Sequence, residues 1–276
     1  MSLDPSVQVR FAEAQAGLQE AFAFHQRGQL AEAEGRYRDV LLLVPEHPDV
    51  LHMLGVLEAQ KGNPGGAVEL LRRVIAVSPA NPAVHNNYGN ALMDLDRPDE
   101  ALASYDRALT LKPDYVQALN HRGGALRRLK RYEEALGSYD RALAISPADV
   151  EVLNNRGNAL RDLGKPEEAL ASYDRALSLR PDHVQILSNK GNALKELGRF
   201  DESLATYGRA LVLHPGCVEA LYNRANTLRE LQRYEEALAD YERALAVKPD
   251  YAEALHNRGA TDRKSTRLNS SHTDIS

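Results

Sequence analysis

The sequence predicts an all-α protein made of tandem helical repeats, and two observations support this. Prolines recur at a constant spacing of 34 residues, namely Pro45, Pro79, Pro113, Pro147, Pro181, Pro215 and Pro249. A proline cannot continue a helix, so each one marks the end of a structural unit. Within a unit the apolar residues follow helical spacing, as in Leu153, Leu160 and Leu163 before a turn and Leu170, Tyr173 and Leu177 after it.

Each unit is therefore expected to form a helix, a tight turn, a second helix and a proline-ended turn. With the proline placed at position 32, seven full repeats begin at Ala14, Pro48, Pro82, Val116, Val150, Val184 and Val218, and a partial eighth begins at Ala252. Residues 1–13 are expected to form a lead-in helix or an extension. Residues 14–260 form the repeat array.

Small residues and one tyrosine define the predicted core. Position 8 is glycine and positions 20 and 27 are alanine in most repeats, while position 24 is tyrosine; repeat 5 shows all four, as Gly157, Ala169, Ala176 and Tyr173. Small side chains let neighbouring helices approach closely, and the tyrosine and leucines fill the remaining volume. No repeat could bury its apolar face alone, so the repeats must stack.

These columns resemble the tetratricopeptide repeat, and the resemblance covers residues 14 to about 260. It implies a right-handed α-solenoid of seven full repeats plus a partial eighth. Position 7, usually apolar in that family, carries a base here, as in Arg156 and Lys190. A long basic side chain can lay its stem on the packed layer and keep its head in water. We expect these bases to neutralise acids on the neighbouring helix rather than to bind a ligand.

The partial eighth repeat stops matching the pattern after Ala260. Residues 261–276 are rich in serine, threonine and charge and lack a second helix and a closing proline, a composition typical of disorder. We expect a disordered tail, foreign to the array and joined on by cloning or assembly. A native disordered tail is the alternative.

Composition excludes several classes of protein. The formal net charge is -5, whereas an array that binds nucleic acid normally carries a basic excess. No apolar run approaches the roughly 18 residues of a membrane span, and no secretory signal precedes the array. We therefore expect a cytoplasmic protein without nucleic-acid or membrane partners. The single cysteine, Cys217, excludes an internal disulfide.

The sequence also lacks the motifs of an enzyme. It contains no phosphate loop, no His-Glu-x-x-His helix and no nucleophile elbow. The nine histidines are scattered over different repeat positions rather than gathered like metal ligands. We expect no catalytic activity, no metal and no cofactor.

Asparagines concentrate on one face of the first helix of the repeats. They occupy position 5 as Asn86, Asn120 and Asn154, position 6 as Asn87, Asn155, Asn189, Asn223 and Asn257, and position 9 as Asn90, Asn158, Asn192 and Asn226, while His121 stands at position 6 of repeat 4. Bases follow on the same face at position 12, as Arg127, Arg161, Lys195 and Arg229. Positions 5, 6, 9 and 12 lie on overlapping stripes of a helix, so these side chains share a face.

An amide both donates and accepts hydrogen bonds, as a peptide backbone does. Neighbouring helices pack roughly 8–10 Å apart and an extended chain advances about 3.3 Å per residue, so each repeat would meet about every third residue of a bound peptide. The pattern predicts a groove that binds a protein or peptide segment in extended conformation. The alternative is a structural column, in which these amides bond to the adjoining repeat.

The strings HNNYGNAL and LNNRGNAL resemble the superhelical arm of O-GlcNAc transferases and their bacterial Spindly-type relatives. That resemblance implies that the asparagines at position 6 hold an acceptor peptide for a C-terminal transferase domain that uses a UDP-sugar, with His121 interrupting the row. No part of the chain resembles the transferase domain, so this chain would select substrates and catalyse nothing.

A third interpretation is a co-chaperone type of array, which clamps the terminal carboxylate of its partner. Such a clamp would use Asn158, Asn189, Lys195 and Arg229. The length of the array favours an extended ligand over this clamp.

Overall fold

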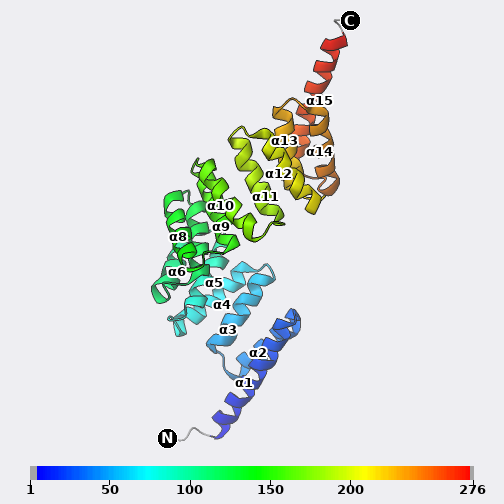
Figure 1. Ribbon diagram of the computed structural model, residues 1–276. Coiled ribbons are helices and arrows are strands. Elements are labelled where there is room, and N and C mark those ends of the chain that lie inside the picture. The colour runs from blue at the N-terminus through cyan, green and yellow to red at the C-terminus, as the bar shows by residue number, and fades with distance from the viewer. Residues whose placement is uncertain (1–4, 274–276) are drawn as a thin grey trace. The chain divides into compact units, whose positions relative to one another are not determined.

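Helices account for all of the regular secondary structure in the part of the chain that the structure describes. A computed structural model describes the backbone of residues 5–273, with the side chains of residue 10 and residues 12–267. Within that range the chain forms 15 α-helices and no strand (Figure 1). The predicted all-α solenoid of helical repeats is confirmed. None of the described helices is both long and apolar enough to cross a membrane.

The chain divides into two compact units, at the junction between repeats 4 and 5. Unit 1, Met1–Ile145, contains α1 (Pro5–Gln26), α2 (Leu30–Leu43), α3 (Pro48–Gln60), α4 (Pro64–Val77), α5 (Pro82–Asp94), α6 (Pro98–Leu111), α7 (Val116–Arg128) and α8 (Tyr132–Ile145). Unit 2, Ser146–Ser276, contains α9 (Val150–Asp162), α10 (Pro166–Leu179), α11 (Val184–Glu196), α12 (Phe200–Leu213), α13 (Val218–Glu230), α14 (Tyr234–Val247) and α15 (Ala252–Thr273).

Within each unit every helix packs on the next, and the first helices of successive repeats also touch, from α3 to α7 in unit 1 and from α9 to α15 in unit 2. The helices α3, α5, α7, α9, α11, α13 and α15 begin at the residues predicted as repeat starts. The 34-residue register is therefore confirmed. Residues 5–13, expected as a lead-in, form the beginning of α1.

A contact between glycine and tyrosine sets the spacing of the two helices in a repeat. The tyrosines at position 24 are fully buried, and Tyr173 has no exposed surface. A Cβ atom added to Gly157 would lie 2.5 Å from Cε1 of Tyr173, and Gly89, Gly123 and Gly191 meet their tyrosines at the same distance. The glycine column is therefore explained by the ring that occupies its side-chain space.

The turn between the two helices requires one residue with left-handed backbone. Position 15 has positive φ in all seven full repeats: Gly28, Gly62, Gly164 and Gly198 at 71–78°, and Asp96, Lys130 and Gln232 at 58–60°. Glycine adopts this conformation without strain, whereas other residues do so at a cost. The sequence analysis did not single out this position, because three of the repeats lack the glycine that marks it.

The proline-ended turns are tied to the following repeat. The arginine at position 26 donates to the carbonyl of the preceding proline, as in Arg73 to Pro45 at 3.1 Å and Arg175 to Pro147 at 2.7 Å. In repeat 3 the imidazole of His85 lies 2.8 Å from the Pro79 carbonyl instead.

The end of the array differs from the expectation of disorder after Ala260. Helix α15 continues to Thr273, and residues 274–276 lie outside the described part of the chain. Thr261 is fully buried at position 10, where most repeats place alanine and repeat 7 places the buried Thr227, and its hydroxyl donates to the carbonyl of Asn257 at 2.7 Å. Neither proline nor glycine follows before Thr273, so nothing in the local sequence breaks the helix.

Replacing Gly157 with alanine is expected to lower the free energy of unfolding by about 1–3 kcal/mol, because the new Cβ would displace the Tyr173 ring. Urea denaturation followed by circular dichroism measures this. The matched control is Gly124→Ala in α7, where nothing lies within 4 Å of the added Cβ. That change should stabilise by about 0.5–1 kcal/mol, because alanine favours a helix interior. An equal rise in the free energy of unfolding for both variants would show that the contact between Gly157 and Tyr173 does not limit the side chain at this position.

Candidate functional site

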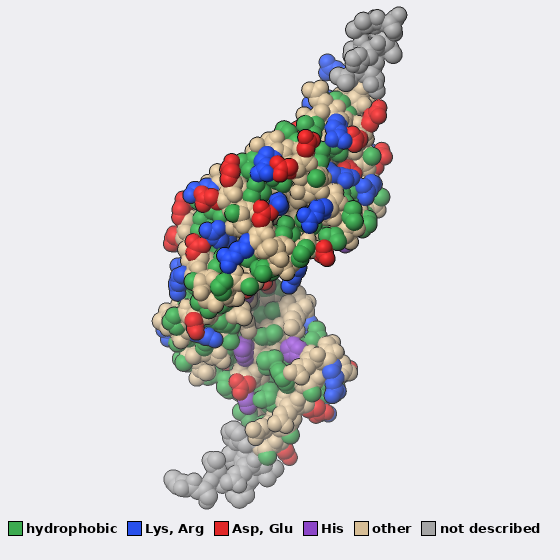
Figure 2. All heavy atoms as spheres, in the orientation of Figure 1, with side chains coloured by type: hydrophobic (Ala, Val, Ile, Leu, Met, Phe, Trp, Pro, Cys, Tyr) green, Lys and Arg blue, Asp and Glu red, His purple; other side chains and the backbone are tan. Residues whose placement is uncertain are grey.

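Positions 5, 6, 9 and 12 of the first helices form what we call the amide face. Its surroundings differ between the two units. Figure 2 shows histidine side chains at the surface over the region of α3 and α4, whereas acidic and basic side chains intermingle over the helices of unit 2. The two parts of the amide face are therefore described separately.

In unit 1 the amide face is a connected hydrogen-bond chain. The Asn87 Nδ2 lies 2.9 Å from Nε2 of His52, one repeat earlier. Asn86 donates to Oδ1 of Asn87 at 3.4 Å, and Nδ1 of His121 lies 2.9 Å from Oδ1 of Asn86. Asn86 and Asn120 are buried, with 4% and 7% of their surface exposed. These two predicted groove residues therefore lie beneath the surface.

In unit 2 two of the asparagines at position 6, Asn189 and Asn257, bond to the preceding repeat. Asn189 donates to Oδ1 of Asn154 at 2.9 Å, across a 35-residue separation. Asn257 donates to the Tyr222 hydroxyl at 2.9 Å and to Oδ1 of Asn226 at 3.0 Å. Much of this column thus links repeats, as the structural alternative predicted.

Asn223 differs from the rest of the column. No hydrogen bond joins its side chain to any other side chain in the described part of the chain. Its amide therefore remains available to a ligand. Asn155, at the same position of repeat 5, does have an interaction within the chain.

The asparagines at position 9 are oriented by the buried tyrosines. The hydroxyls of Tyr105, Tyr173, Tyr207 and Tyr241 donate to Oδ1 of Asn90, Asn158, Asn192 and Asn226, at 2.8, 2.8, 2.5 and 2.5 Å. Burial raises the pKa of Tyr241 to about 12, so these hydroxyls keep their protons at neutral pH. With its oxygen held by the tyrosine, the Asn192 amide keeps its nitrogen for another partner.

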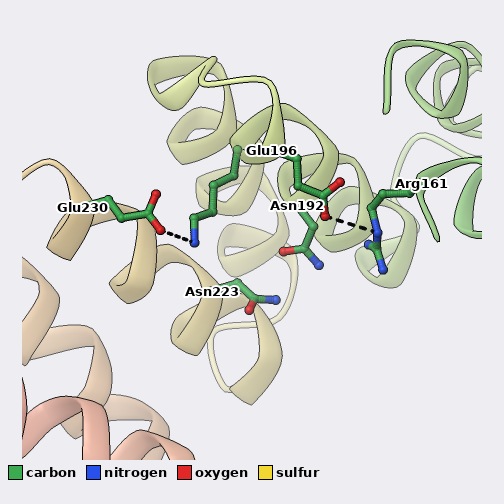
Figure 3. A pocket seen from close by; sticks show the side chains of 6 residues that line it. Arg161, Asn192, Glu196, Asn223 and Glu230 are labelled. Atoms are coloured by element: carbon green, nitrogen blue, oxygen red, sulfur yellow. Dashed lines mark ion pairs between the residues drawn. The ribbon is translucent and has the colours of Figure 1, made fainter. Parts of the chain in front are cut away.

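A hollow of about 430 Å³ lies on the amide face of unit 2. Six side chains from α9, α11 and α13 line it: Arg161, Asn192, Lys195, Glu196, Asn223 and Glu230 (Figure 3). The two amides of Asn192 and Asn223 lie between the charged side chains in this view.

The charges around the hollow are paired between repeats. The base at position 12 contacts the acid at position 13 of the next repeat, Arg161 with Glu196 at 3.5 Å and Lys195 with Glu230 at 2.7 Å. Burial raises the pKa of Glu196, and the charges of Arg161 and Lys195 oppose that rise. Two cations face two anions, so the hollow has no net charge.

The remaining predicted bases have different surroundings. Arg229 makes no ion pair with any described residue, since position 13 of repeat 8 is Lys264 rather than an acid. Arg127 lies half-buried on α7 and has an interaction within the chain. The acids Glu196 and Glu230 were missed in the sequence, although their offset of 35 residues from the bases could have revealed them.

The bases at position 7 neutralise acids, as predicted. Arg122 contacts Asp106 of the preceding repeat at 2.7 Å, and Lys190 contacts Asp174 at 2.6 Å. In repeat 7 the preceding repeat offers Gly208 at the acid's position. Arg224 instead makes two hydrogen bonds of 2.6 Å to Asp240 of its own repeat, which stands where repeats 3 to 6 have serine or threonine.

Replacing Arg224 with alanine is expected to destabilise unit 2 by about 3 kcal/mol, because the Asp240 carboxylate would stay buried with Arg243 as its remaining partner. The matched control is Lys190→Ala, whose partner Asp174 is half exposed, so that loss should stay below about 1 kcal/mol. Urea denaturation measures both. Equal losses of unfolding free energy in the two variants would show that the buried pair stabilises the protein no more than the exposed pair does.

In the described residues no group of histidine, cysteine, aspartate and glutamate side chains is arranged to hold a metal ion. The amide face is a polar surface, with amides and paired charges in the hollow and hydrogen-bonded links between repeats.

Comparison with known proteins agrees with the fold. Tetratricopeptide-repeat models match residues 18–82, 87–150, 150–183 and 188–252. A tetratricopeptide repeat protein from Parabacteroides merdae is 16% identical, with a TM-score of 0.75, covering 91% of this chain and 99% of that one.

Two further solved structures are more similar in sequence. YrrB, described as a TPR protein with an unusual peptide-binding site, is 26% identical with a TM-score of 0.53, covering 70% of this chain and 99% of its own. A thermophilic TPR protein of Thermus thermophilus is 24% identical with a TM-score of 0.56, covering 65% and 98%. The search of curated proteins gave no match. The family models span most of the chain at the register of its repeats, and the chain belongs to the tetratricopeptide-repeat family.

Proposed function

We propose that this chain is a protein-protein interaction scaffold that holds an extended segment of its partner against the amide face of unit 2. Tetratricopeptide repeats generally mediate protein-protein interactions, and the fold is typically non-catalytic. The observation that carries the proposal is the hollow in which Asn223 has no side-chain partner among the described residues and Asn192 keeps its amide nitrogen free of the tyrosine bond.

The charge of the hollow favours a neutral, dipolar ligand. Its two bases and two acids are paired with each other, so neither sign dominates. A peptide backbone offers a carbonyl acceptor and an amide donor without a net charge. The spacing of the repeats suits an extended segment that meets the face about every third residue. YrrB, a relative in sequence, has a peptide-binding site.

A clamp for a terminal carboxylate is less well supported. Lys195 is held by Glu230, Asn158 accepts from Tyr173, and Asn189 donates to Asn154. Of the four groups such a clamp would need, Arg229 alone has no partner among the described residues. Blocking the C-terminus of a bound peptide should therefore leave its affinity unchanged.

A second candidate function is the substrate-selecting arm of an O-GlcNAc transferase-like protein. The repeated asparagine at position 6 and the strings HNNYGNAL and LNNRGNAL favour it. In that case the same face would hold an acceptor peptide for a transferase domain elsewhere in a longer protein. Sequencing the transcript beyond the codon for Ala260 tests this, since an open reading frame without such a domain contradicts it.

Replacing Asn223 with alanine is expected to weaken peptide binding roughly 2- to 12-fold, the equivalent of one hydrogen bond of about 0.5–1.5 kcal/mol. The melting temperature should stay unchanged, because this side chain links nothing within the chain. Fluorescence anisotropy with a random library of peptides blocked at both ends measures affinity, and circular dichroism measures melting.

The control is Asn189→Ala at the same position of the preceding repeat. Asn189 is 8% exposed and bonded to Asn154, so its loss should lower the melting temperature. If the Asn223 variant binds every peptide within twofold of the wild type, the amide face of unit 2 is not the binding site.

A further inference from the structure

The hydrogen-bond chain of His121, Asn86, Asn87 and His52, which we call the polar row of unit 1, has the same donor-to-acceptor direction throughout. The bonds of 2.9, 3.4 and 2.9 Å run from His121 through Asn86 and Asn87 to His52. Each amide accepts through its oxygen from the side of α7 and donates through its nitrogen towards α3. The chain joins three first helices, α3, α5 and α7, which touch one another. Nε2 of His52 is the last acceptor.

An imidazole nitrogen can accept a hydrogen bond only when it carries no proton. The bond from Asn87 therefore requires neutral His52 with its proton on Nδ1. Burial lowers the pKa of His52, and the charge of Asp49 on the same helix partly opposes this. The elements that pack on α3 add little charge: Asn87 of α5 is the polar neighbour, and His85 of α5 is bonded to the Pro79 carbonyl. Asp49 is the charged group that acts on this pKa among the described residues.

We propose that His52 is a positioning residue for the amide face of unit 1, and that its protonation reverses the orientation of the Asn87 and Asn86 amides. A proton on Nε2 would face the Asn87 nitrogen, so the amide must turn to present its oxygen. The Asn87 nitrogen then faces the nitrogen of Asn86, which must turn in the same way. His121 must finally accept at Nδ1, and it does so by exchanging its ring proton to Nε2 through solvent.

The reversal changes which group faces a ligand. Asn87 is half-buried, so part of its amide reaches the surface. In the neutral state its nitrogen is directed to His52 and its oxygen to Asn86, and in the protonated state the two exchange places. The row would thus offer different hydrogen-bonding groups at mildly acidic and neutral pH. This consequence for binding extends the proposed function from the amide face of unit 2 to that of unit 1 and rests on it, whereas the reversal itself does not.

Unit 2 provides an internal comparison without a titratable group. The bond from Asn189 to Asn154 has the same 35-residue offset and the same length of 2.9 Å as the bond from Asn87 to His52. Asn154 at position 5 of repeat 5 therefore accepts the same bond that His52 accepts at position 5 of repeat 2. His52→Asn should keep an acceptor for Asn87 and remove the proton-binding site.

The sign of the effect on stability follows from the lowered pKa. The folded state disfavours protonated His52, so the unfolded chain binds more protons at mildly acidic pH. The stability of unit 1 is complete above the ordinary pKa of histidine and falls as the pH decreases through the lowered value. The His52→Asn variant should lack this component.

The test is an NMR titration of the full-length, isotope-labelled chain between about pH 8 and pH 4.5. The side-chain amide signals of Asn87 and Asn86 are expected to shift together, with one midpoint below the ordinary pKa of histidine. In His52→Asn these shifts should vanish, while His214→Asn, at an exposed turn position of unit 2, should titrate like the wild type. Amide signals that stay constant while His52 titrates, or shifts that persist in His52→Asn, would overturn the inference.

A binding measurement tests the consequence for a ligand. The probe is an uncharged peptide of alternating serine and alanine, acetylated and amidated, because its own charge does not change with pH. Its affinity for the wild type should change at least about threefold across the midpoint, and for His52→Asn it should stay within twofold. Absence of binding at every pH would contradict the proposed function, and the amide titration would still decide the role of His52.

Discussion

The contact between the glycine at position 8 and the tyrosine at position 24 governs the architecture of repeats 3 to 6. Because the ring lies where a Cβ would be, a larger side chain at position 8 of these repeats would push the ring or the helix away. The same approach brings the tyrosine hydroxyl to the asparagine at position 9. A packing contact in the core therefore orients a polar group on the surface, and the amide face depends on it.

Polar contacts between repeats then fix how the repeats stack. Arginines at position 26 hold the proline carbonyls, and bases at position 7 meet acids of the preceding repeat. Repeat 7 shows that the charge balance matters more than the position of the acid. Where Gly208 replaces the usual aspartate, Asp240 appears on the other side of Arg224 and pairs with it. A buried charge left without a partner is costly. The loss of the usual aspartate at Gly208 is therefore matched by the appearance of Asp240.

The same repeat pattern gives the two units different surface chemistry. In unit 1 histidines occupy positions that hold asparagine elsewhere, and the polar side chains bond to one another in series. In unit 2 paired charges and amides surround a hollow, and the amide of Asn223 has no side-chain partner in the part of the chain that the structure describes. The difference arises from a few substitutions at positions 5, 6, 9 and 12, outside the columns of small residues and tyrosine that pack the repeats, so the surface varies while the fold is preserved.

The sequence by itself determined the fold class, the 34-residue register and the start of nearly every first helix, because prolines, small residues and helical spacing are local signals that recur in phase. It also placed the asparagines on one face and the bases of position 7 beside acids. The sequence analysis expected disorder after Ala260 from the serine, threonine and charge content of the tail. It did not consider that Thr261 falls on the buried position 10 of the repeat. Only the tertiary structure decided which amides are free. Whether Asn189 or Asn223 has a partner depends on the side chain that the preceding repeat brings to it across a 35-residue offset, and such a contact exists only once the repeats are stacked.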